Sequence, residues 1–143
     1  MQGQPKKVLD GPAIIQLQDI IRRVPVAPHV IEYAMRLVRA TRVTEPDVPE
    51  VIKRYVSWGA GPRACQFLIL GGKVRAVLQG RSYVSTEDIQ AVALPVMRHR
   101  IVMNFNADAD GYSADRVVEE LIATIPAKES EIKRNPATSK AVQ

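Results

Sequence analysis

Apolar residues recur every three or four positions through most of this chain, and glycine or proline interrupts each run. The first run follows Asp10-Gly11-Pro12 and ends at Pro25. This spacing places apolar side chains on one face of a helix, whereas a half-buried strand needs strict alternation. The sequence contains no internal repeat and no alternation of strand and helix. The pattern therefore predicts an all-α domain, in which the run over residues 14–24 buries one helix face.

Further helices are predicted by the same spacing and by their capping residues. Pro28 suits the first turn of a helix, where its fixed φ is already helical and its missing N–H is not needed. Ser85, with Asp88 three residues later, has the form of a capping box. Ser113 is expected to cap the last helix. The predicted helices begin near Pro28, Pro49, Arg63, Ser85 and Ser113, and end near Thr41, Trp58, Gln79, Pro95 and Ile125.

Glycine and proline add detail to this scheme. Gly80 is expected just after the C-terminal end of the long helix. Gly71 and Gly72 lie inside that helix, where each costs about 1 kcal/mol relative to alanine, so we expect close packing there. Pro95 is expected to end or kink its helix. With residues 100–106 taken as extended, the sequence predicts a bundle of about four to six helices and a short extended pair.

The basic charge of the chain is unevenly distributed. The formal net charge is +5, but residues 10–81 carry about +5 and residues 82–125 about −4. Apolar content falls sharply near the C-terminus. We therefore divide the chain into a flexible segment, 1–9, a helical domain, 10–125, and a disordered tail, 126–143. The distribution indicates that an anionic group meets the basic half of the domain.

The composition excludes several classes of protein. Aromatic residues make up 5% of the chain, too few for a platform that stacks single-stranded nucleic acid. The single cysteine, Cys65, excludes an internal disulfide and a cysteine-based zinc site, and it fits a reducing compartment. No apolar run reaches the roughly 18 residues of a membrane span, and the first residues do not form a signal peptide. A cytoplasmic location is expected.

Three short motifs resemble nucleotide or metal sites without completing them. Gly72-Lys73 lacks the first glycine and the final hydroxyl residue of a phosphate-binding loop. Residues 59–64 fit the G-x-G-x-x-A dinucleotide pattern, but no strand–helix–strand unit surrounds them. Residues 106–111 resemble the front of a calcium loop, yet Val117 occupies the position that must supply a bidentate carboxylate. We predict no metal site.

Catalytic groups are sparse. His29 and His99 are the only histidines, and both are expected at the surface or in packing contacts. Cys65 lies on a helix that we expect to be buried, where cysteine is usually a small core residue. The sequence offers no grouping of serine, histidine and acid. An enzyme complete in itself is therefore not expected.

One local feature favours binding of an anion. Pro62-Arg63 opens the long helix directly after a glycine turn. The N-terminus of a helix offers unbonded N–H groups and the positive end of the helix dipole. An arginine side chain keeps its charge and can donate to two phosphate oxygens at once. The sequence therefore points to Arg63 as a candidate phosphate-binding residue.

Five segments of the chain share residues and order with one known family. They are Val24-Pro25-Val26-Ala27, residues 30–42, residues 55–64, residues 80–89, and Arg98-His99-Arg100-Ile101 with Asn104-Phe105. Together they resemble the C-terminal lid of MoxR-type AAA+ ATPases, and the likeness covers about residues 8–126. Residues 59–64 are similar to that family's sensor-2 segment, often written G-A-S-P-R-A. Gly61 stands where the family usually has serine.

The resemblance implies a helical lid that packs over a nucleotide held by a separate αβα ATPase core. Arg63 would be the sensor-2 arginine, which acts with that core in ATP hydrolysis by reaching the γ-phosphate. Its neighbours Pro62 and Ala64 would lie beside the nucleotide, which is ATP with Mg²⁺. Tyr33 and the segment 24–27 would lie near the adenine or ribose.

The resemblance also implies an assembly and a cellular role. Such ATPases usually form rings, often hexamers, in which a lid contacts the core of its own chain and neighbouring subunits. They act as chaperone-like remodellers that mature partner proteins, often proteins with von Willebrand A domains.

Motifs of the ATPase core are not found in these residues. Walker A, Walker B, sensor-1 and arginine-finger segments do not occur. We therefore expect a C-terminal part of a longer ATPase, beginning with an added or internal methionine, that neither hydrolyses ATP nor binds it tightly alone. The alternative is a free-standing helical adaptor, or a nucleic-acid-binding domain that uses the arginines of residues 22–81, with nucleic acid the less favoured partner.

Overall fold

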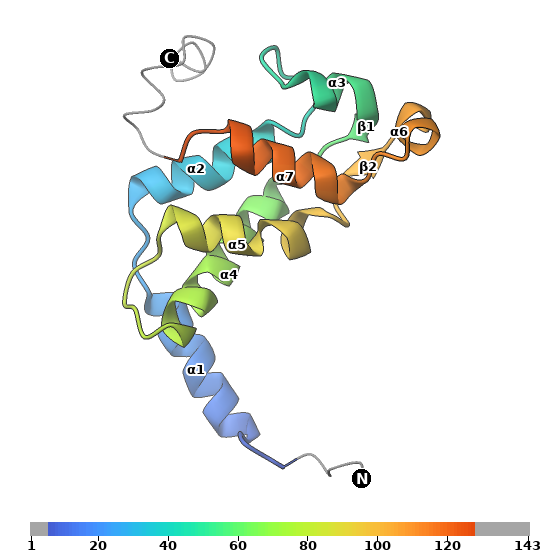
Figure 1. Ribbon diagram of the computed structural model, residues 1–143. Helices are drawn as coiled ribbons and strands as arrows, with labels where there is room; N and C mark the ends of the chain where they lie inside the picture. The colour runs from blue at the N-terminus through green and yellow to red at the C-terminus, as the bar shows by residue number, and fades with distance from the viewer. Residues whose placement is uncertain (1–5, 128–143) are drawn as a thin grey trace.

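The computed structural model describes residues 6–127, and the regular structure of these residues is mostly helical (Figure 1). Of the predicted tail, 126–143, all but the first two residues lie outside the described residues. The helices are α1 (Gly11–Arg23), α2 (Pro28–Arg39), α3 (Glu50–Tyr55), α4 (Pro62–Leu78), α5 (Thr86–Met97), α6 (Phe105–Asp110) and α7 (Ala114–Thr124). Two strands, β1 (Val56–Trp58) and β2 (Val102–Met103), form an antiparallel pair. The mostly helical class and the short extended pair are confirmed.

Local sequence signals place most of the helix ends correctly. Pro28 occupies the first turn of α2, and Ser85 begins α5 with its capping box. The Ser113 side chain accepts a hydrogen bond from the backbone N–H of Arg116 at the start of α7. Gly80 follows α4 with φ +70°, a left-handed conformation that glycine adopts without strain. These ends depend on contacts within four residues, so the sequence alone predicts them.

The segment after α3 folds differently from the prediction. The helix expected to run to Trp58 ends at Tyr55, and residues 56–58 form β1. Their pairing partner, β2, lies more than 40 residues later in the chain. Periodicity within one segment cannot reveal such a partner, and this explains the error.

The segment expected to be extended is a strand only at residues 102–103. The Asn104 side chain then caps α6 by accepting from the N–H of Ala107, so the calcium-like stretch 106–111 is mostly helical. Asp110 of this stretch accepts hydrogen bonds from Arg54 Nη2 and the Tyr55 hydroxyl, both at 2.9 Å. This acidic residue therefore fastens α6 to α3.

The core lies around α4 and α5, which cross at the centre of the molecule (Figure 1). A Cβ atom at Gly72 would lie 3.0 Å from Val84 Cγ1 and 3.1 Å from Ile89 Cδ1. One at Gly71 would lie 3.3 Å from Val92 Cγ2. The expected close packing at this glycine pair is confirmed. Helix α5 continues two residues past Pro95 before it ends at Met97, so the proline stands in the last turn.

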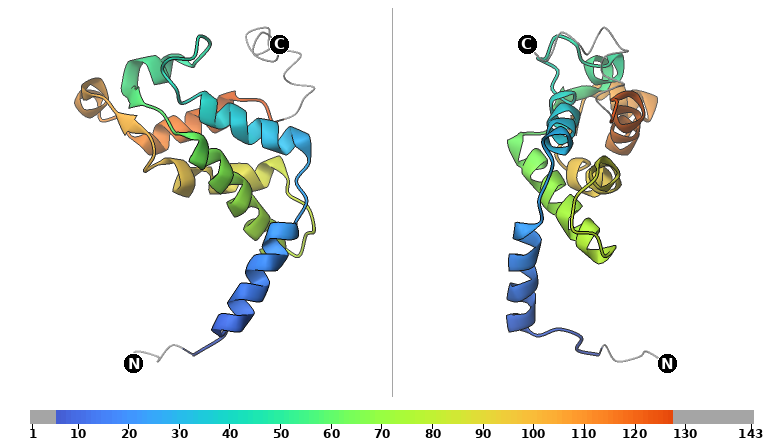
Figure 2. Two further views of the ribbon diagram at one scale, coloured as in Figure 1. Left: turned by 180° about the vertical axis from the view of Figure 1, so that it is seen from behind. Right: turned by 90° about the vertical axis from the view of Figure 1, so that its left-hand side faces the viewer.

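Helix α1 forms as predicted, but its predicted burial is wrong. It has no buried residue and projects from the bundle, with only its C-terminal end beside α4 (Figures 1 and 2). Val24, directly after the helix, is buried. No helix in residues 6–127 is both long and apolar enough to cross a membrane.

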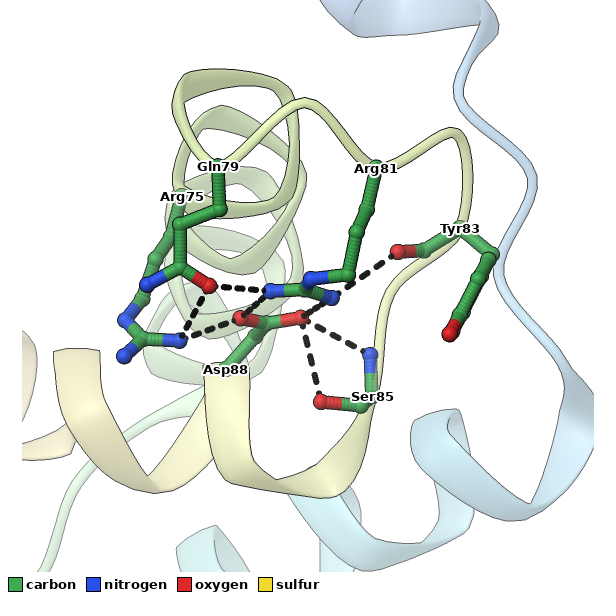
Figure 3. Close-up of polar contacts among 6 residues, drawn as sticks. All are labelled: Arg75, Gln79, Arg81, Tyr83, Ser85 and Asp88. Carbon is green, nitrogen blue, oxygen red and sulfur yellow. Dashed lines mark hydrogen bonds and ion pairs between the residues drawn. The ribbon is translucent and has the colours of Figure 1, made fainter.

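A carboxylate with no exposed surface joins α4 to α5 (Figure 3). Asp88 accepts from Arg75 Nη1 at 2.6 Å and from Arg81 Nη1 and Nη2 at 2.7 and 2.6 Å. It also accepts from the backbone N–H of Ser85 at 2.9 Å. Arg81, Ser85 and Arg75 together hold the pKa of this carboxyl well below its usual range, although burial alone would raise it.

Replacing Asp88 should destabilise the fold in a pH-dependent way. At neutral pH, Asp88→Asn should lower the free energy of unfolding by about 3 kcal/mol, because a neutral amide cannot balance two guanidinium groups. The folded-state pKa is depressed, so this stabilisation is complete above the unfolded-state pKa of about 4. It is lost as the pH falls through that value towards the folded-state pKa. Urea unfolding followed by circular dichroism measures the difference.

The matched control is Asp47→Asn, which changes an exposed aspartate. Its effect should stay within about 0.5 kcal/mol. An Asp88→Asn deficit that is equally large at about pH 6 and about pH 3 would contradict the assignment of this stabilisation to the ionised carboxylate.

Candidate functional site

Arg63 stands in the first turn of α4 with its side chain in solvent. It makes no hydrogen bond or ion pair with any other residue of the described range 6–127. Gly61 is the N-cap residue, and it has no side chain to occupy the positive end of the helix. An uncommitted guanidinium therefore lies beside an uncapped helix N-terminus, an arrangement that suits a phosphate or another anion.

A buried threonine holds the turn that precedes Arg63. Thr41 Oγ1 donates to the carbonyl of Val38 at 2.7 Å and accepts from the backbone N–H of Ala60 at 2.8 Å. Gly59 packs so tightly that a Cβ atom there would lie 2.2 Å from the Thr41 carbonyl oxygen. The C-terminal end of α2 is thus pinned to the start of α4, and this contact fixes where Arg63 stands.

The sequence interpretation missed the role of Thr41. It named Thr41 only as the approximate end of a predicted helix. The residue type was one usable signal for such a role, because a threonine hydroxyl that is buried needs hydrogen-bond partners. The identity of the partner, Ala60, depends on how α2 and α4 pack.

An open pocket of about 620 Å³ lies at the other end of α2. It lies between the α1–α2 connection and the start of α5. Its lining residues are Pro25, Val26, Ala27, His29, Tyr83, Val84, Ser85, Thr86, Glu87 and Ala127. The pocket and Arg63 are separated by about the length of α2, near 18 Å for twelve residues.

The other residues predicted to contact the nucleotide differ in their exposure to solvent. Pro62 is exposed at the first position of α4, whereas Ala64 is fully buried and contributes to the core. Tyr33 is also fully buried, and its hydroxyl accepts a hydrogen bond from Gln90 Nε2 at 2.9 Å. Burial raises the pKa of the Tyr33 hydroxyl. Tyr33 does not line the pocket, and the nucleotide contacts of these residues stay predictions.

The histidines and the cysteine occupy the kinds of place expected for them. His29 is exposed at the pocket, and His99 is exposed beside Arg100. Cys65 is half-buried against the core, and burial raises the pKa of its thiol. Residues 6–127 contain no cluster of three or more His, Cys, Asp or Glu side chains that could hold a metal ion.

Comparisons with known proteins show the family to which this chain belongs. Residues 48–121 match the family model described as AAA lid domain. Chaperone MoxR1 of Mycobacterium tuberculosis is 33% identical over 122 residues, which are 85% of this chain and 32% of that protein. Protein MoxR of Methylorubrum extorquens is 46% identical over 50 residues, which are 35% of this chain and 15% of that protein.

A solved structure is also similar. It is the crystal structure of a protein predicted to be an ATPase, from Cytophaga hutchinsonii, with a TM-score of 0.76 and 30% identity. The match covers 80% of this chain and 35% of that one. This chain therefore spans at most about a third of the length of these relatives.

Removing the Thr41 hydroxyl should loosen the turn before Arg63. Thr41→Val keeps the size of the side chain but leaves the buried N–H of Ala60 without an acceptor, which should cost about 1–3 kcal/mol of unfolding free energy. Thr41→Ser keeps the hydroxyl and should cost less, although it loses a buried methyl group. Chemical denaturation of both variants measures the difference. A valine variant as stable as the serine variant would show that the hydroxyl does not hold the turn.

Restoring a capping side chain at Gly61 should stabilise α4. A Cβ atom there would meet nothing within 4 Å, so serine fits, and its oxygen can accept from an N–H of the first turn. Gly61→Ser should raise the free energy of unfolding by about 0.5 kcal/mol. The control Gly61→Ala adds the carbon without the oxygen and should not stabilise. Equal stability of the two variants in thermal unfolding would contradict the capping role.

Proposed function

Because the chain belongs to the AAA lid domain family, in the MoxR type of AAA+ ATPases, we propose that it closes over a nucleotide held by an αβα core of the same protein. The core would bind ATP and Mg²⁺. The lid would sense which nucleotide is bound, and its movement would couple ATP hydrolysis to remodelling of a partner protein.

The observation that carries this proposal is the state of Arg63. Its guanidinium is exposed, unpaired within the described residues, and held at a helix N-terminus by the Thr41 contact. A group that stays charged and carries several donors suits the γ-phosphate, where negative charge develops during phosphoryl transfer. Its contribution to hydrolysis would be electrostatic, because the nucleophile and the metal ligands belong to the core.

The pocket at the other end of α2 supports the same orientation of the nucleotide. Residues 25–27 line it, and they belong to the segment 24–27 that the family resemblance places near adenine or ribose. The base would then face the start of α2 and the phosphates would face Arg63. Tyr33 lies on α2 between the two ends with its ring in the core. Tyr33 would therefore affect a bound nucleotide only indirectly, by helping to set the position of α2.

The role of the whole protein follows from its relatives. MoxR1 is named a chaperone, and we extend a chaperone-like role to the protein that contains this lid. It would work as a ring, often a hexamer in this family, in which each lid contacts the cores of neighbouring subunits. Its partners would be proteins that need maturation, including those with von Willebrand A domains. Dependence on ATP would place it in the cytoplasm.

The nucleic-acid alternative is less well supported. Five arginines of the basic half pair with carboxylates: Arg22 with Asp19, Arg39 with Glu45, Arg54 with Asp110, and Arg75 and Arg81 with Asp88. Paired arginines contribute little to attraction of a phosphate backbone. Arg63 differs from them in having no partner in residues 6–127.

Truncating Arg63 in the complete ATPase should lower steady-state ATP turnover by about 10-fold or more, because a transition-state contact to a charged donor is typically worth a few kcal/mol. Arg63→Lys keeps the charge without the planar pair of donors and should fall between wild type and Arg63→Ala. The matched control is Arg116→Ala, at an exposed arginine in the first turn of α7. Turnover of Arg63→Ala equal to that of Arg116→Ala would remove Arg63 from the mechanism.

A further inference from the structure

A second arginine lies over the face of α4 that carries Arg63. Arg100 follows α5, and because α5 crosses α4 the chain returns here to the first half of α4 (Figure 1). The Cζ atom of Arg100 lies 5.0 Å from the centroid of the Phe67 ring. Phe67 stands four positions after Arg63, so the two share one helix face. A helical side chain leans towards the helix N-terminus, which brings this ring back over the turn that holds Arg63.

The Arg100 guanidinium is held on one side and open on the other. Its Nη1 atom donates to the carbonyl of Val96 at 2.5 Å and also contacts His99 Nε2. The Phe67 ring adds a cation–π contact. The Nε and Nη2 atoms make no hydrogen bond within residues 6–127, and neither atom is fully buried. The side chain is thus fixed in place while two of its nitrogen atoms stay available to a ligand.

No carboxylate of the described residues neutralises Arg63 or Arg100. Arg98, two positions before Arg100, does have such a partner, because it pairs with Asp115 at 3.0 Å. Neighbouring cations repel each other, and an anion between them removes that cost. Phe67 is 45% exposed, so this face of α4 is open to solvent and to a ligand. The arrangement therefore suits an anion with more than one negative charge.

We propose that Arg100 is a second phosphate-binding residue, which acts with Arg63 on the terminal phosphate of ATP; the inference rests on the proposed function. A terminal phosphate has enough oxygen atoms and charge to accept from two guanidinium groups at once. ADP lacks this phosphate, so Arg100 contributes to the difference in affinity between ATP and ADP. Phe67 is a positioning residue, because its ring holds Arg100 in place.

A purely structural role for Arg100 would have a different consequence. Its bond to the Val96 carbonyl lies in the last turn of α5, where an arginine can cap the helix. A lid that is weakened at this point would lose affinity for ATP and ADP alike. The ratio of the two affinities therefore distinguishes phosphate binding from capping.

The test measures binding of a slowly hydrolysed ATP analogue and of ADP, both with Mg²⁺, to the complete ATPase by calorimetry. Arg100→Ala should weaken the analogue by about 10-fold and ADP by less than about 2-fold, since a charged contact to the terminal phosphate is lost. Arg100→Lys keeps the charge without the planar set of donors and should fall between wild type and Arg100→Ala. The matched control is Arg98→Ala, at the arginine already paired with Asp115, and it should bind both nucleotides like wild type.

The positioning contact has a test of its own. Phe67→Leu keeps an apolar side chain but removes the ring beside Arg100. It should weaken the analogue by about 3-fold, the size of an exposed cation–π contact, and leave ADP binding unchanged. The matched control is Phe105→Leu, at the other phenylalanine of the chain, which is 82% exposed. This control should change neither affinity.

Three results would overturn the inference. Arg100→Ala could weaken the analogue and ADP equally, which would assign Arg100 to the capping of α5. It could bind both nucleotides like the Arg98→Ala control. It could leave both affinities unchanged but weaken association of the subunits in size-exclusion chromatography, which would assign Arg100 to a carboxylate of a neighbouring subunit.

Arg63→Ala, measured in parallel, separates this inference from the proposed function. If Arg63→Ala binds the analogue like wild type while Arg100→Ala binds it about 10-fold more weakly, the sensor role of Arg63 is rejected and the phosphate contact of Arg100 is kept. If only Arg63→Ala weakens the analogue, the inference is rejected and the proposed function is kept.

Discussion

The buried carboxylate of Asp88 is the contact on which the arrangement of the central helices depends. It lies at the start of α5 and receives donors from Arg75 on α4 and from Arg81 in the following turn (Figure 3). One side chain thus joins the end of one helix, the connection and the beginning of the next. The glycines of α4 allow α5 to approach closely enough for this contact. The same connection carries Tyr83 to the pocket, so the clamp that stabilises the core also shapes the candidate binding surface.

A second, smaller clamp links the fold to Arg63. Thr41 lies two residues after α2 and holds the backbone before α4, so the orientation of these two helices determines where Arg63 stands. The pocket lies at the opposite end of α2. A rigid helix therefore connects the two places at which we propose that a nucleotide contacts the lid. Movement at one place would be transmitted to the other because the helix and its contacts move together.

The apolar face of α1 is a second kind of surface, because no residue of this helix is buried among the described residues. Arg63 is polar and isolated, and its guanidinium suits a charged ligand. The two surfaces therefore differ in chemistry as well as in place.

The sequence by itself determined the features that act within one turn of helix. The three-to-four spacing, the Ser85 capping box, the Gly80 stop and Arg63 at the start of α4 all depend on neighbours along the chain, and the structure has each of them. Only the tertiary structure decided which faces find a partner. It left the apolar face of α1 without a buried residue, buried Tyr33 and Ala64, made residues 56–58 a strand and gave Thr41 its acceptor role. These outcomes depend on segments far apart in the chain, whose contacts are set by packing and not by local conformational preference.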